Sequence, residues 1–75
     1  NPSSGSFIIN CEGDMIHDVY LSVYDILGQQ VDFTSEMLNS ELNSRSYAIS
    51  ITEPGTYILK VRSGTNTYYR KLIKQ

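Results

Sequence analysis

Hydrophobic and polar residues alternate along most of the chain, in short runs separated by turn-forming residues. The alternation is clearest at Tyr47, Ile49 and Ile51, which are separated by small residues, and a period of two predicts a strand with one buried face. Five further runs are rich in strand-forming residues: 6–11, 18–25, 29–34, 57–62 and 67–74. The pattern therefore predicts six strands.

Parity within each run assigns one side of the strand to the core. Lys60 and Arg62 fall on outward positions of their run. The residues predicted to point inward are Phe7, Ile9, Cys11, Val19, Leu21, Val23, Tyr57, Leu59 and Val61. Strands with one solvated face are typical of antiparallel sheets, and two such sheets stack as a sandwich. We therefore expect an all-β sandwich.

Short turns are expected between the strands. Asp25 and Gly28 bracket a four-residue segment in which Asp bonds the backbone and Gly takes a positive φ. Pro54 and Gly55 suit the second and third positions of a turn, and Gly64 marks another. Residues 35–45 show no clear period, so they are assigned as a connection with one possible short strand, the seventh.

The 75-residue length suits one domain, residues 1–75. A chain this short has little room for a deep cleft beside its core, so we expect no enzyme, cofactor or small-molecule substrate. Its apolar runs fall far short of the about 20 residues of a membrane-spanning helix. The polar start at Asn1 is unlike a signal peptide. If the protein is secreted, its export signal lies upstream, so the chain is expected to be a fragment of a larger protein.

Charge is divided along the sequence. All eight acidic residues lie at or before Glu53, which with Arg45 gives residues 1–53 a charge of −7. Residues 54–75 carry +5, from Lys60, Arg62, Arg70, Lys71 and Lys74. One interpretation is a recognition edge for an acidic partner. The other is a solvated edge that resists aggregation. Nucleic acid is not expected to bind, since the net charge is −2.

Other chemistry-bearing residues have simpler interpretations. Cys11 shares the parity of Phe7 and Ile9, as a small buried hydrophobe would. His17 stands without a nucleophile pattern around it. Glu12, Asp14 and Asp18 could offer oxygen ligands, but they lack the spacing of a calcium loop. We expect no catalytic or metal site.

Several motifs together resemble one family. The chain opens with Asn1-Pro2 and Gly5-Ser6-Phe7 and continues with residues 21–28, Leu-Ser-Val-Tyr-Asp-Ile-Leu-Gly. Gly55-Thr56-Tyr57 and the basic strand Arg70 to Lys74 follow in order. This arrangement resembles the type A C-terminal sorting domain of the type IX (Por) secretion system of Bacteroidetes.

The resemblance implies an immunoglobulin-like antiparallel sandwich of six to seven strands. It implies a sorting signal for an upstream cargo domain that passes through the periplasm and outer membrane to the cell surface or medium. The partners would be the outer-membrane translocon and a sortase that removes the domain near Asn1. The residues expected to be recognised are Gly55, Tyr57, Lys60, Arg62, Arg70, Lys71 and Lys74.

Two other functions stay open. The same fold could serve as an immunoglobulin-like structural or adhesive spacer beside another domain, and a spacer need not end its polypeptide. A carbohydrate-binding sandwich would need exposed aromatic residues in a row, for which Tyr20 and Tyr24 are the candidates.

Overall fold

The computed structural model describes residues 2–3, 5–12, 18–41 and 44–75, and its regular elements are all strands. Within these residues no helix is long and apolar enough to cross a membrane. The strands are β1 (Pro2–Ser3), β2 (Phe7–Glu12), β3 (Val19–Asp25), β4 (Gln30–Val31), β5 (Thr34–Glu41), β6 (Ser44–Ser50), β7 (Gly55–Ser63) and β8 (Asn66–Lys74).

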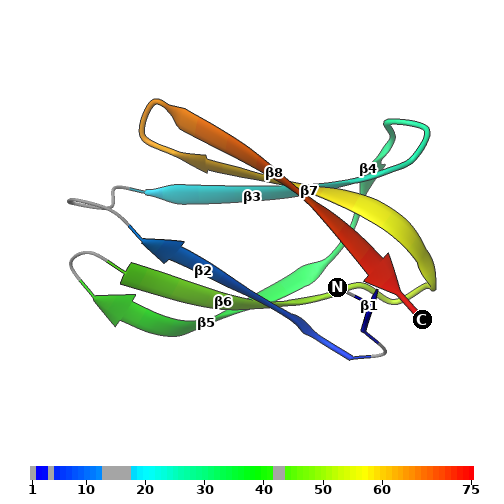
Figure 1. Ribbon diagram of the computed structural model, residues 1–75, viewed down its shortest axis with the longest axis horizontal. Coiled ribbons are helices and arrows are strands. Elements are labelled where there is room, and N and C mark those ends of the chain that lie inside the picture. Colours follow the sequence, from blue (N-terminus) through cyan, green and yellow to red (C-terminus); the bar gives the residue numbers. More distant parts are fainter. Residues whose placement is uncertain (1, 4, 13–17, 42–43) are drawn as a thin grey trace.

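The strands form two sheets that lie face to face (Figure 1). One has five strands in the order β1-β8-β7-β3-β4, and the other has three in the order β2-β6-β5. All pairings are antiparallel except that of β1, which runs parallel to the end of β8, with Pro2 opposite Ile73. The predicted all-β sandwich is confirmed, with this two-residue parallel pair as a departure from a purely antiparallel one.

The core lies between the sheets and comes from inward positions that parity predicted, with Leu72 of β8 in addition. The five-stranded sheet contributes Val23, Tyr57, Leu59, Val61 and Leu72, all buried. Phe7, Tyr47 and Ile49 come from the three-stranded sheet, and Ile51 follows directly after β6. Ile9, Cys11, Val19 and Leu21 are partly buried against this core. The predicted inward faces are therefore confirmed.

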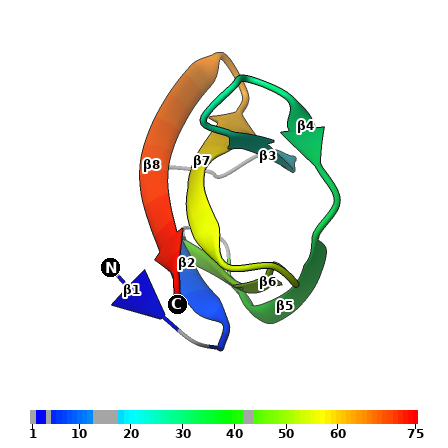
Figure 2. The same cartoon turned by 90° about the vertical axis from the view of Figure 1, so that its right-hand side faces the viewer.

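The structure differs from two predictions about the middle of the chain. The expected strand over 29–34 is paired with β3 only at Gln30 and Val31. The chain then passes to the other sheet, where the possible short strand within residues 35–45 is the eight-residue β5. Figure 2 shows this crossing along one side of the sandwich. With β1 and β4 the described residues form eight strands, one more than the upper expectation.

Candidate functional site

The predicted recognition residues lie on the hairpin of β7 and β8. Gly64 is in the two-residue connection, and the flanking Ser63 and Asn66 are paired. The φ angle of Gly64 is 60°, which glycine adopts without the clash that a Cβ atom would cause. The register continues from there to Gly55 opposite Lys74. The hairpin thus brings residues from both ends of the basic segment side by side.

The five basic residues of the hairpin do not form one surface. Residues directly opposite each other in a sheet point to the same face. Arg70 is opposite the buried Leu59, whereas Lys71 is opposite Ile58. Lys60, Arg62 and Lys71 therefore share the outer face of the five-stranded sheet, and Arg70 and Lys74 share the inward parity of Leu72. The expectation of a single basic edge is wrong because alternation along β8 separates Arg70 from Lys71.

Tyr57 is a structural residue of the corner between β6 and β7. Its side chain is buried, and its hydroxyl donates a hydrogen bond of 2.7 Å to the carbonyl oxygen of Glu53. Gly55 has a φ of 151°, and a Cβ placed there would be 3.5 Å from the Tyr57 hydroxyl oxygen. Pro54 lies in the same corner. The ring is packed in the core, as the inward parity of Tyr57 predicted.

Asp25 and Gly28 organise the connection between β3 and β4. The Asp25 Oδ1 atom accepts hydrogen bonds of 2.9 Å from the backbone N–H groups of Leu27 and Gln29. Gly28, with a φ of 85°, donates its N–H to the Asp25 carbonyl at 3.0 Å. Ile26 and Leu27 stand exposed at the tip. The Asp side chain thus replaces backbone partners that this tight turn lacks.

Cys11, near the end of β2, has an unreactive setting. Burial raises the pKa of the Cys11 thiol, which keeps it protonated and lowers its nucleophilicity. Asp14 and His17 lie outside the described residues, as does the rest of the loop that joins Glu12 to Asp18. In the part of the chain that the structure describes, no three residues among His, Cys, Asp and Glu gather as a metal site would require.

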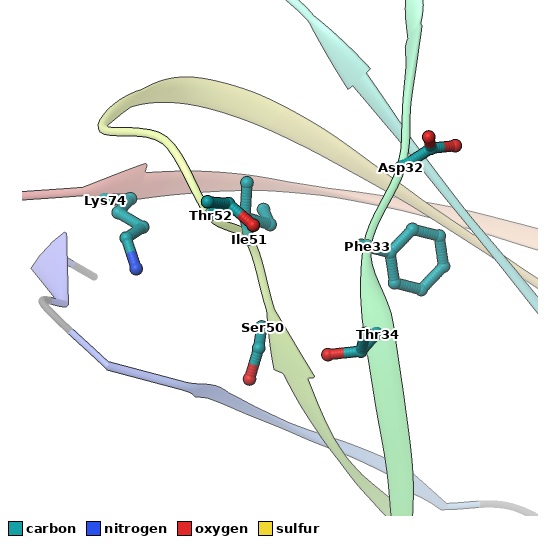
Figure 3. A pocket seen from close by; sticks show the side chains of 7 residues that line it. All are labelled: Asp32, Phe33, Thr34, Ser50, Ile51, Thr52 and Lys74. Carbon is teal, nitrogen blue, oxygen red and sulfur yellow. The ribbon is translucent and has the colours of Figure 1, made fainter.

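An open hollow lies where the chain crosses between the sheets (Figure 3). Its lining is mixed: Asp32, Phe33, Thr34, Ser50, Ile51, Thr52 and Lys74. The Ser50 hydroxyl is already bonded to that of Ser6 at 2.9 Å. No pattern along the sequence predicted this hollow, because its residues come from three separate segments. Its lining contains neither histidine nor cysteine.

Comparison with known proteins gives one family. A family model described as a secretion system C-terminal sorting domain matches residues 1–75. Among curated proteins none matches. Among solved structures, the chain is similar to the Ig1 domain of mouse SynCAM 2, with a TM-score of 0.45 and 16% identity over 100% of this chain and 88% of that one.

Proposed function

Because this chain belongs to the secretion system C-terminal sorting domain family, we propose that it is the type IX sorting signal of a cargo protein, read in its folded form by the outer-membrane translocon. Domains of this family mark proteins that are exported across the outer membrane to the cell surface or the medium. The role as a sorting signal entails contact with the secretion machinery. A sortase then cuts the chain near Asn1 and releases residues 1–75 from the cargo.

The observation that carries the proposal is the match of the family model along the whole chain. One feature of the fold supports recognition of the folded domain by the translocon. The terminal hairpin presents exposed cations on a sheet whose other face is fixed by buried Leu59, Val61 and Leu72. We propose this hairpin as the recognised element, acting through the side chains on the outer face of the sheet. Gly55 and Tyr57 support it from the corner where β7 begins.

The test is a fusion of residues 1–75 to the C-terminus of a periplasmic reporter in a host with a type IX system. We expect the reporter at the cell surface or in the medium, without the 75 residues. A matched fusion carrying Leu72→Asp places a carboxylate in the core and is expected to leave the reporter in the periplasm. If the wild-type fusion stays in the periplasm although the domain is folded, the sorting function is contradicted and the spacer function is favoured.

Sortase removal is tested separately from export. The mass of the exported reporter shows whether the 75 residues are gone and where the chain was cut. We expect a cut near Asn1. An exported reporter that keeps its full mass would contradict removal while leaving the sorting function in place.

A further inference from the structure

The outer face of the five-stranded sheet carries aromatic and basic side chains in neighbouring rows. The register places Arg62 between Tyr20 and Thr67 in one row, and Lys60 between Ser22 and Tyr69 in the next. A third row holds Tyr24, Ile58 and Lys71. We call this surface the aromatic–basic face, made of Tyr20, Tyr24, Lys60, Arg62, Tyr69 and Lys71. It is assembled from three strands, so no single segment of the sequence shows it.

Large parts of this face are exposed. Tyr69 has 63% of its surface accessible and Tyr20 has 60%. The Arg62 guanidinium lies over the Tyr20 ring, 5.8 Å from its centre. Such a pair stabilises neighbouring strands, but stability alone does not require Tyr69, whose cross-strand partner Lys60 is polar. Tyr and Arg are the residues that dominate binding energy at protein interfaces.

The opposite outer face of the sandwich has the reverse charge. Glu36 is opposite Ala48, and Ala48 is opposite the exposed Ile8, which fixes that row as outward. Glu12 and Glu41 flank Ser44 in another outward row. No Lys or Arg occupies an outward position among the described strand residues of this sheet, and none of the described outward positions of β3, β7 and β8 holds Asp or Glu. Three glutamates and three basic residues therefore lie on opposite outer faces of the sandwich.

We propose that the aromatic–basic face is the docking surface for an acidic protein surface on the secretion machinery. The inference rests on the proposed sorting function and identifies the surface that the secretion machinery contacts. Three cations on a face whose described strand positions hold no Asp or Glu attract an acidic partner and orient the domain, because the glutamate face is repelled from it. The exposed tyrosines then supply contact area once the two surfaces meet.

A protein is favoured over a lipid or lipopolysaccharide surface on charge and on side-chain type. Sequences that bind anionic lipid headgroups carry roughly four to eight clustered Lys and Arg residues. This face has three, in a domain with a net charge of −2. Tyrosines, by contrast, are enriched at protein interfaces. The occupant is therefore an acidic protein patch.

Two matched pairs of variants in the reporter fusion test the face. R62Q/K71Q and R70Q/K74Q each remove one Arg and one Lys from the same hairpin, but only the first pair lies on the face. We expect R62Q/K71Q to reduce the export rate about tenfold, as loss of electrostatic steering does, and R70Q/K74Q to keep it near wild type. Charge reversal by R62E/K71E is expected to reduce export further, because like charges then meet.

Tyr69 and Tyr68 form the second pair, since they are adjacent, similarly exposed at 63% and 56%, and point to opposite faces. Tyr69→Ser is expected to slow export several-fold and Tyr68→Ser to leave it nearly unchanged. Thermal unfolding of each purified domain shows that the variants remain folded. Equal export of all folded variants would overturn the proposal while the wild-type fusion still reports the sorting function.

A binding assay separates the two sources of negative charge. The purified domain is mixed with vesicles of phosphatidylcholine containing phosphatidylglycerol and, separately, with lipopolysaccharide. We expect no binding at physiological ionic strength. Binding to either one that R62Q/K71Q abolishes and R70Q/K74Q retains would assign the face to an anionic lipid surface and overturn the choice of a protein.

Discussion

Strands β7 and β5 are similar in length but opposite in their surroundings. β7 is paired on both sides, with β3 and β8, and its side chains alternate between buried and accessible. β5 lies at the edge of the smaller sheet, paired only with β6, and nearly all of its side chains are exposed. A register shift between Met37 and Asn39 interrupts its pairing. β7 contributes buried side chains to the core, whereas β5 depends on its pairing with β6.

The difference explains why one strand can be recognised from the sequence and the other cannot. Because Tyr57, Leu59 and Val61 are buried, every second residue of β7 is a large apolar one, and this period is visible in the sequence. An edge strand without a buried face has no such constraint, and its conformation follows from backbone pairing with β6. The bulge at Leu38 also twists the edge away from regular pairing, as natural edge strands commonly do to resist aggregation.

The largest expected effect is from Leu59→Ala in β7. Leu59 has no exposed surface, so its truncation leaves a cavity and is expected to cost about 2–5 kcal/mol. Against a total stability of about 5–15 kcal/mol for a domain, this loss is severe. Urea unfolding followed by far-UV circular dichroism measures it. A loss below about 1 kcal/mol would show that β7 is not central to the core.

Gly55→Ala tests the backbone at the start of β7. A Cβ atom would meet the Tyr57 ring at ordinary contact distance, so the cost comes from the φ of 151° and is expected to be about 1–3 kcal/mol. Gly5→Ala is the control, since a Cβ there has nothing within 4 Å. Equal midpoints of urea unfolding for the two variants would contradict the assigned strain.

Tyr57→Phe removes one hydrogen bond and keeps the ring. The lost bond to the Glu53 carbonyl is expected to cost about 0.5–1.5 kcal/mol. Tyr68→Phe, on an exposed ring of the same hairpin, is expected to cost almost nothing. Thermal unfolding of both variants compares them, and a neutral Tyr57→Phe would mean that the hydroxyl does not fasten the corner.

The smallest effect is expected from Leu38→Ala in β5. The substitution is chemically the same as Leu59→Ala, but Leu38 is 50% exposed and sits at the bulge. Its cost is expected to stay within about 0.5 kcal/mol. The ratio between the two Leu variants measures how unevenly the strands contribute. A loss at Leu38 comparable to that at Leu59 would show that the edge is packed in solution.

Sequence patterns predicted the buried faces of β2, β3, β6 and β7, because each alternates between the core and solvent. They failed at β4, where a run that looks like one strand is shared between two sheets, with Phe33 at the crossing. The pairing of β1 with β8 also escaped prediction, since two residues carry no period. For the site, the linear sequence gathers five basic residues in its last segment. The register of β8 with β7 separates Arg70 from Lys71, whereas the burial of Tyr57 follows from the parity of its run.

The order of the strands has a consequence for synthesis. The three-stranded sheet is complete in sequence by Ser50, yet its apolar side, with Phe7, Tyr47 and Ile49, is covered by Leu59, Val61 and Leu72. Leu59 and Val61 arrive with β7, but a nascent chain that stops before β8 still lacks Leu72 and the strand that pairs with β7. The mature shape of this domain therefore exists only once translation has reached its final strand.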